Sequence, residues 1–358
     1  MVDEDSRLLS SCLSLRCHSL TPLGFVLGAA VCFRRQPRMP TTRATMGLRT
    51  VVVTVLFFAA ESMLSYNFYD KTCPSFSKIV RETVTNKQIA SPTTAAATVR
   101  LFFHDCFVSG CDASVLVSST PFNSAERNAD INLSLAGDAF DLITRSKTAL
   151  ELECPQTVSC ADILAVATRD LVSMAGGPFY RVPLGRRDAR VSSSSYVEGQ
   201  LPRSTMSFSQ VAQIFQARNF SMQEMVALAG AHTIGFSHCS EFYPHLRTDS
   251  GYNPRFAKAL ESACGGYHSN PTLSVANDIM TPSKFDNMYY QNLERGLGLL
   301  SSDHAFSREP ATKGFVQMYA ADQNRFFSDF ATAMVKLGLH GVKLGDAGEI
   351  RRRCDQIN

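Results

Sequence analysis

Cysteine is the residue that most limits what this chain can fold into. The sequence holds 11 cysteines in 358 residues, and three of them, Cys12, Cys17 and Cys32, precede Met46. The later cysteines form an even set, which suits disulfide bonds formed in an oxidising compartment. Because eight cysteines can pair in roughly a hundred ways, their spacing selects no pairing by itself. The cysteines therefore predict a cross-linked, exported domain.

The segment 46–65 has the plan of a secretory signal peptide. A short basic start at Met46 leads into an apolar run over 51–60, and small residues follow near Ser65. The run is too short for a comfortable membrane span, although a buried core helix is a competing interpretation. We expect a mature chain that has no membrane span and is secreted to the extracellular space.

Residues 1–45 fit no single interpretation. They are rich in arginine, almost free of acidic residues after Asp5, and apolar over 20–33. An organelle-type presequence, a second hydrophobic signal and a start codon placed too far upstream are all open. We favour the upstream start, because Met46 begins a complete signal by itself.

Composition and periodicity narrow the class of the remaining domain, residues 66–358. The net charge is +3 and the basic residues are scattered, which gives no support to nucleic-acid binding. The segment reads as helices joined by Gly- and Pro-rich turns, without a sustained alternating strand pattern. The sequence therefore predicts an all-α domain.

The sequence indicates where three helices begin or end. A helix over 160–174 is expected to start after Ser159, and a last helix is expected over 326–337. Ser221 and Glu224 have the spacing of a capping box, in which each side chain bonds the other's backbone N–H.

A fourth predicted helix, over 94–107, sets a guanidinium and an imidazole on one face. Ser91 is expected to cap it, and Arg100 and His104 are four residues apart, with Phe103 beside them. A neutral imidazole can take up a proton, and a permanently charged guanidinium can stabilise developing negative charge. This pairing suits cleavage of an O–O bond; a satisfied surface pair is the plainer alternative.

Two strings carry a family resemblance. The string at 100–107 (Arg-Leu-Phe-Phe-His-Asp-Cys-Phe) resembles the distal-helix signature of the secretory plant (class III) haem peroxidases, and the string at 225–235 resembles their proximal motif. Further matching strings lie in the family's order, so the resemblance runs from about residue 66 to residue 354. It implies the all-α haem peroxidase fold, with a distal lobe (about 66–198) and a proximal lobe (about 199–358) enclosing one haem b.

The resemblance also implies roles at the haem. His232 would be the axial iron ligand, with Asp303 bonded to its other ring nitrogen. Asp303 has the alternative of capping a helix, or of doing both. Asn132 would bond the second ring nitrogen of His104. Asn132 also begins a glycosylation sequon; we expect it to be buried and unmodified, and Asn219 to be the better glycan candidate.

The activity that the resemblance implies is reduction of hydrogen peroxide to water, coupled to one-electron oxidation of phenolic donors. His104 would be the acid and base, and Arg100 would stabilise charge. Donors would meet the exposed haem edge near Pro202, in the cell-wall, lignin-type and oxidative-stress chemistry of a plant. Arg203 would favour acidic donors, unless it is simply a solvated surface residue. The protein is expected to be a monomer and to lie in the apoplast, at the cell wall.

Two calcium ions complete the set of implied cofactors. The distal ion would use side chains or carbonyls of Asp105, Val108, Gly110, Asp112 and Ser114, with Glu126 joining through water. From the residues alone, that segment is a polar turn. The proximal ion would use Thr233, Asp278, Thr281, the carbonyl of Lys284, and Asp286.

Four disulfide bonds are implied by the resemblance: Cys73–Cys154, Cys106–Cys111, Cys160–Cys354 and Cys239–Cys264. One departure from the family lies near the proximal imidazole, where Asn277 stands at a position that is often apolar. Two other function classes have less support. One is a binding protein on the same fold that has lost turnover, against which the intact Arg100, His104, His232 and Asp303 argue. The other is a metal-dependent hydrolase using His104 and Asp105, for which the sequence offers no further helical His or Asp ligands.

Overall fold

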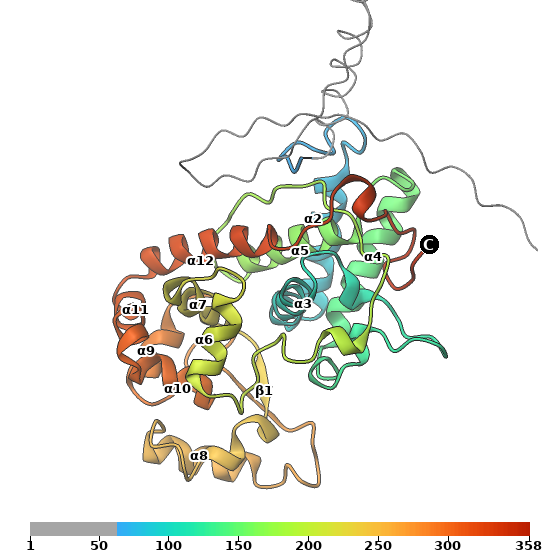
Figure 1. The fold of residues 1–358 in the computed structure, drawn as a ribbon. Helices are drawn as coiled ribbons and strands as arrows, with labels where there is room; N and C mark the ends of the chain where they lie inside the picture. The colour runs from blue at the N-terminus through green and yellow to red at the C-terminus, as the bar shows by residue number, and fades with distance from the viewer. Residues whose placement is uncertain (1–62) are drawn as a thin grey trace, which may run out of the picture. The chain divides into compact units, whose positions relative to one another are not determined.

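The structure is a computed structural model that describes residues 63–358, so the predictions for residues 1–45 and for the signal segment up to residue 62 lie outside it. The described chain is mainly helical (Figure 1), as the all-α prediction required. Its α-helices are α2 (Phe76–Ala90), α3 (Thr94–Val108), α4 (Gly137–Glu153), α5 (Cys160–Met174), α6 (Phe208–Gln216), α7 (Met222–Ala229), α8 (Pro254–Cys264), α9 (Met288–Glu294), α10 (Ser301–Arg308), α11 (Pro310–Ala321) and α12 (Gln323–Gly338).

Regular β structure in the described part is limited to one small antiparallel pair, whose strands lie on either side of α8 in the sequence. Strand β1 (Phe236–His238) pairs antiparallel with β2 (Ser274–Ala276), so that Ser237 lies opposite Val275. The pair lies directly after the turn that carries His232. None of the helices at positions 63–358 has both the length and the apolar character that crossing a bilayer requires.

Two of the predicted helix starts are confirmed by their caps. Helix α5 begins at Cys160 because the Ser159 hydroxyl accepts the Asp162 backbone N–H. At α7 the predicted capping box is present: Ser221 Oγ accepts the Glu224 N–H, and Glu224 accepts the Ser221 N–H at 2.7 Å. Each bond satisfies a backbone donor that a helix start leaves free.

The predicted cap of α3 is wrong, because a tertiary contact takes the Ser91 side chain. Its hydroxyl donates to Asp138 Oδ2 on α4 at 2.7 Å, and α3 begins three residues later, at Thr94, without a side-chain cap. A charged acceptor forms the stronger bond. Helix α12 begins at Gln323, three residues before the prediction, because Asp322 caps it.

The helices pack in two groups that share one hydrophobic core. Helices α2 to α5 pack on one another, and α7 packs with α11 and α12, while α9 and α10 pack on α11. Helix α3 also contacts α12, and buried residues from both groups form one continuous apolar cluster. A separate smaller cluster lies around α8, which Figure 1 shows apart from the other helices. Helix α3 therefore lies within the core.

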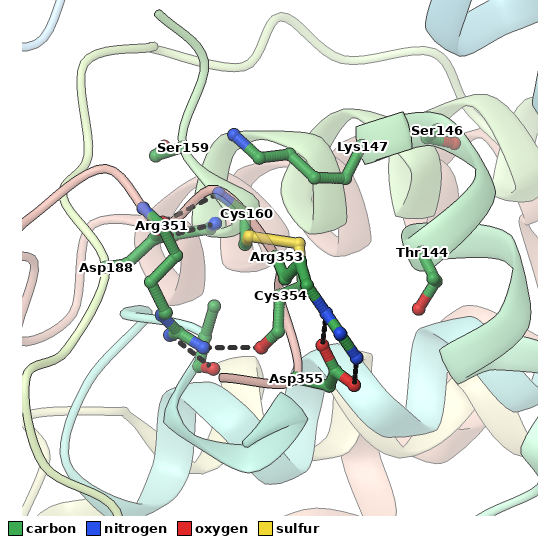
Figure 2. Close-up of a disulfide and its surroundings, with 12 residues drawn as sticks. Thr144, Ser146, Lys147, Ser159, Cys160, Asp188, Arg351, Arg353, Cys354 and Asp355 are labelled. Atoms are coloured by element: carbon green, nitrogen blue, oxygen red, sulfur yellow. Dashed lines mark hydrogen bonds and ion pairs between the residues drawn. A yellow bond between two sulfur atoms is a disulfide. The ribbon is translucent and has the colours of Figure 1, made fainter. Parts of the chain in front are cut away.

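Four disulfides cross-link the described chain, and they join the pairs that the resemblance implied: Cys73–Cys154, Cys106–Cys111, Cys160–Cys354 and Cys239–Cys264. The bond from Cys160 to Cys354 spans 194 residues and fixes the C-terminal segment to the start of α5. Figure 2 shows how Asp188 supports this junction, since its carboxylate accepts the backbone N–H groups of Cys160 and Arg351.

Candidate active site and cation sites

The distal histidine is buried and held in one tautomer by its neighbour. His104 on α3 is 6% exposed, and its Nδ1 lies 2.6 Å from Asn132 Oδ1. Asn132 is oriented in turn, because its Nδ2 donates to the Glu126 carbonyl oxygen at 2.8 Å. An amide oxygen can only accept, so Nδ1 carries the proton and Nε2 keeps its lone pair. His104 is thereby set up as a proton acceptor at Nε2.

The protonation state of His104 follows from burial. Burial and the nearby positive charge of Arg100 lower the pKa of His104 from 6.5 to about 3, and the bond to Asn132 opposes this only in part. The ring is therefore neutral at neutral pH. A neutral ring is the state that a general base requires.

Arg100 reaches across to the segment that carries Asn132. Its guanidinium donates to the Ser134 carbonyl at 3.0 Å and to Ser134 Oγ at 2.8 Å. The residue is exposed, so these bonds fix the direction of a charge that stays accessible. Phe103 lies between the two polar residues in sequence and stacks on Phe107 with ring centroids 4.1 Å apart. The structure thus brings Arg100, Phe103, His104 and Asn132 together.

The proximal histidine has a carboxylate partner instead of an amide. His232 lies in a 3-10 turn (Gly230–Thr233) after α7, and its Nδ1 is 3.1 Å from both oxygens of Asp303 on α10. Burial opposes protonation of this ring, but the Asp303 carboxylate outweighs it, so the pKa of His232 is raised. Asp303 is buried and does not cap α10, whose N-cap is Leu300.

The exposed edge of His232 provides a test of whether a haem would fit. Its side chain is 40% exposed although Asp303 beside it is 3% exposed, so the ring is open on the edge away from Asp303. The positive charge of Arg100 opposes protonation of both His104 and His232, although the Asp303 carboxylate still raises the pKa of His232. A ring fixed through Nδ1 by a carboxylate and open at Nε2 is the arrangement of an axial ligand to haem iron. His232 and Asp303 therefore fit a bound haem.

The acidic segment after His104 folds into a buried cluster. Asp105, Asp112, Ser114 and Glu126 are all at most 1% exposed, and Ser114 Oγ lies 3.0 Å from Glu126 Oε2. Glu126 Oε1 is buried without a hydrogen-bond partner. Burial, followed by the charge of Asp112, raises the pKa of Glu126 to about 8 and that of Asp105 well above its usual range. Carboxylates buried in this way fit a cation, because a bound cation would compensate their charge.

A second cluster of oxygens surrounds Thr233, the residue after His232. Its Oγ1 lies 3.5 Å from Asp278 Oδ2, 3.4 Å from the Lys284 carbonyl and 3.4 Å from Asp286 Oδ1. Thr281 Oγ1 is also within 3.2 Å of both carboxylates. One hydroxyl proton cannot satisfy three acceptors, so this convergence fits a hard cation.

No three His, Cys, Asp or Glu side chains within residues 63–358 form a metal site by themselves. An ion at either cluster would therefore need carbonyl and hydroxyl ligands as well, which is common for calcium. The carbonyls of Val108 and Gly110 belong to the distal turn that the Cys106–Cys111 disulfide closes.

Pro202 and Asn277 are two further residues that the resemblance implied to lie near the haem. Pro202 is half-buried, and its neighbour Arg203 donates to Asp130 at 3.0 Å. Arg203 is therefore neither simply solvated nor a free charge. Asn277 bonds Ser237 Oγ at 2.7 Å and the Ile234 carbonyl at 3.3 Å, which gives this polar residue a structural place next to β1.

Sequence reasoning missed three residues that touch the site. Ser134 directs Arg100, but the sequence marks it only as part of a sequon. Tyr289 packs edge-on against His232 with ring centroids 6.0 Å apart. Lys343 pairs with Asp112 from 231 residues away, a contact for which the sequence carries no local signal. The two sequons also differ as expected in burial: Asn132 is 2% exposed, whereas Asn219 is exposed.

Comparison with known proteins agrees with this geometry. A sequence model of the peroxidase family matches residues 80–322. Peroxidase 63 of Arabidopsis thaliana is 63% identical over 305 residues, which cover 85% of this chain and 93% of that protein. Peroxidase 31 of the same plant is 62% identical over 305 residues, covering 85% and 96%, and Peroxidase 65 is 56% identical over 310 residues, covering 86% and 93%.

The helical fold and these similarities define the class: the chain belongs to the peroxidase family. Within that family it is a secretory plant (class III) peroxidase, an oxidoreductase that reduces hydrogen peroxide. Haem and calcium are the cofactors that this family implies.

Proposed function

We propose that this protein is a monomeric apoplastic peroxidase that oxidises phenolic donors, using one haem b and two calcium ions. The observation that carries the proposal is the pair of differently held histidines. His104 is bonded to an amide at 2.6 Å, and His232 is bonded to a carboxylate at 3.1 Å. The first suits a base and the second suits an iron ligand.

His232 would hold the haem iron through Nε2, because Asp303 already occupies Nδ1. The carboxylate raises the basicity of the ligand and so favours oxidised iron. When bound, the haem supplies the redox chemistry: it accepts the oxidising equivalents of the peroxide and passes them to donors one electron at a time.

His104 would move the proton of hydrogen peroxide. Its Nε2 takes the proton from one peroxide oxygen and returns it to the other, which leaves as water when the O–O bond breaks. Asn132 accepts the Nδ1–H throughout, so the ring keeps its orientation while it is transiently charged. Proton transfer by one positioned ring explains why the ring must be neutral at the start.

Arg100 would stabilise the negative charge that develops on the departing oxygen. Its guanidinium stays charged at all relevant pH values, and Ser134 fixes its direction. Phe103 would cover the apolar side of the same space.

The two oxygen clusters would each hold one calcium ion. The distal ion would use Asp105, Asp112 and Ser114 with the carbonyls of Val108 and Gly110, and Glu126 would contribute through water. The proximal ligands are Thr233, Asp278, Thr281, Lys284 and Asp286, and support comes from the oxygens that converge on Thr233 Oγ1. Since Thr233 follows His232 directly, the proximal ion would also steady the iron ligand.

Donors would bind near Pro202, where the charge of Arg203 is paired with Asp130. A paired arginine gives little advantage to an acidic donor, so neutral phenols are the better fit.

A direct test is to produce residues 66–358 with haem and calcium and to measure peroxide turnover with a series of neutral and acidic phenols. We expect turnover that His104→Leu lowers by at least a hundredfold and that His232→Ala abolishes together with tight haem binding. Full turnover in His232→Ala would refute the assignment of the iron ligand. Correctly cross-linked protein that takes up no haem would refute the proposal as a whole.

A further inference from the structure

The C-terminal segment that follows α12 lies against the distal acidic cluster. The Cys111 backbone N–H donates to the His340 carbonyl at 3.0 Å. Gly110 lies so close to Gly341 that a Cβ added to Gly110 would be 2.2 Å from the Gly341 carbonyl oxygen. Gly110 also has φ of +107°, a conformation that favours glycine. The turn that precedes Asp112 therefore takes its shape against residues 340 and 341.

Lys343, two residues further along, places an ammonium group inside this cluster. Its Nζ pairs with Asp112 Oδ2, while Asp112 Oδ1 accepts the Ser114 N–H at 3.0 Å. The Lys343 side chain is only 26% exposed and the Asp112 side chain is fully buried. The backbone of Lys343 is fixed as well, because its carbonyl accepts the Arg187 N–H at 2.8 Å. The Lys343 ammonium group is therefore carried by a segment whose backbone is fixed.

Arg351, from the same C-terminal segment, places a second cation beside the backbone of Asp112 and Ala113. It is fully buried, and it donates to the Ala113 carbonyl at 2.7 Å, to the Asp112 carbonyl at 3.2 Å and to the Cys354 carbonyl at 2.6 Å. Figure 2 shows Arg351 beside the Cys160–Cys354 disulfide, with dashed lines to its partners. The segment that carries both cations is thus anchored covalently to α5.

The charges of the cluster explain what the ammonium would do. Asp105, Asp112 and Glu126 are three buried acidic groups that together can carry one negative charge more than a divalent ion compensates. Lys343 places its positive charge on the Asp112 carboxylate itself, whereas Arg351 bonds backbone carbonyl oxygens. The same ammonium repels an incoming cation, and calcium affinity depends on the charge of the ligand set.

We propose that Lys343 is a tethered cation of the distal calcium site, which holds the segment 105–115 (the end of α3 and the loop after it) in place without calcium and lowers the affinity of that site for calcium. The inference rests on the proposed distal calcium site. Lys343 acts here as a positioning residue, because it touches Asp112 and not the substrate. Its ammonium group stays paired with Asp112 when the calcium ion leaves.

The test uses the haem-containing protein after removal of calcium with a chelator. Calcium alone is titrated back by calorimetry, and hydrogen exchange of the 105–115 peptide is followed with and without calcium. In Lys343→Met we expect about tenfold tighter distal calcium binding, because one repelling charge is gone. We also expect at least about tenfold faster exchange of the loop in the calcium-free state, because its tether is gone.

Two variants make the result specific. Lys343→Arg keeps the charge and should retain both wild-type values. Lys336→Met removes a comparable ammonium group on α12. Lys336 pairs with Glu224 of α7 at 2.7 Å, far from Asp112 in the sequence, and its loss should change neither the calcium affinity nor the exchange rate. These controls separate loss of the Asp112 pair from loss of any lysine that pairs with a carboxylate.

Unchanged calcium affinity and unchanged loop exchange in Lys343→Met would overturn the inference, as would weaker calcium binding. Failure of the calcium assignment has a different signature. In that case the wild-type protein would bind no calcium that slows exchange over 105–115, and the distal site would fall together with this inference.

Discussion

The bond between His104 and Asn132 gives the sharpest test of the distal chemistry. Asn132→Leu keeps the shape of the side chain but removes the acceptor that lies 2.6 Å from Nδ1. It also removes the donor to the Glu126 carbonyl. Asn132→Asp keeps an acceptor at Nδ1 and replaces a neutral partner with a charged one. The two variants therefore change the basicity of His104 in opposite directions.

The expected size of the effect follows from the charge that the ring acquires. In the proposed mechanism His104 takes a proton from peroxide, so its bond to Asn132 would become a bond to a charged group, which is worth about 1.5–3 kcal/mol. Loss of that bond in Asn132→Leu should slow the reaction with peroxide by roughly 10- to 150-fold at neutral pH. The pKa of His104, now about 3, should fall further, since the bond to Asn132 raises it.

Asn132→Asp should instead raise the pKa of His104, because a carboxylate favours the imidazolium. A ring that is protonated before peroxide arrives cannot accept its proton. The wild-type rate should therefore stay level as the pH falls and be lost only near pH 3. In Asn132→Asp this loss should occur at a clearly higher pH.

Stopped-flow measurement of the second-order reaction with peroxide, across pH 3 to 9 in wild type and variants, checks both statements. Asn123→Leu is a suitable control, because it removes one amide donor to the Ser192 carbonyl, at 2.8 Å, without touching His104. A rate within twofold of wild type in Asn132→Leu would show that the ring needs no fixed tautomer. An acid limb that does not move in Asn132→Asp would refute the electrostatic argument.

Four further results are expected. Arg100→Leu should slow the peroxide reaction by about 100- to 1000-fold, the usual cost of removing one preorganised charge donor, and stopped-flow rates with unaltered haem content check it. Asp303→Asn should raise the iron reduction potential by roughly 60 to 130 mV, the one-electron equivalent of a charged hydrogen bond worth about 1.5–3 kcal/mol; spectroelectrochemistry measures this shift, and an unchanged potential would contradict the role of Asp303. Calcium removal should lower activity, lower the melting temperature and alter the haem spectrum, whereas an unaltered spectrum in fully stripped protein would count against the proximal site. Replacing Cys160 and Cys354 by Ala should cost about 5 kcal/mol of stability in the chain-entropy account of a loop of 194 residues, which denaturant unfolding can measure.

Much of the fold could be predicted because its signals are local. The start of α5 and the capping box of α7 depend on residues three apart, and both were read correctly from the sequence. The predicted cap of α3 is wrong for the opposite reason, because the Ser91 hydroxyl donates to Asp138 on another helix. A helix boundary can thus be predicted only where no tertiary partner competes for its capping side chain.

The candidate site is likewise only partly predictable from local sequence. Motifs around residues 100–107 and 225–235 identify the two histidines, but no local pattern in them shows which partner each ring will meet. Asn132, Asp303 and Lys343 reach their partners from 28, 71 and 231 residues away. Such pairings depend on how the helices pack, so a resemblance to a family can imply the first two, and nothing in the sequence implies the third.

The two histidines show how one residue type is given two tasks. Both are affected by burial and by Arg100, which lower their pKa values. Only His232 has a carboxylate partner, and that partner reverses the shift, whereas the amide beside His104 cannot. The difference between an amide and a carboxylate at Nδ1 is therefore enough to separate a neutral base from a strongly donating ligand. It follows that Asn132→Asp should make the distal ring resemble the proximal one, with a gain in basicity and a loss of the neutral state that peroxide cleavage requires.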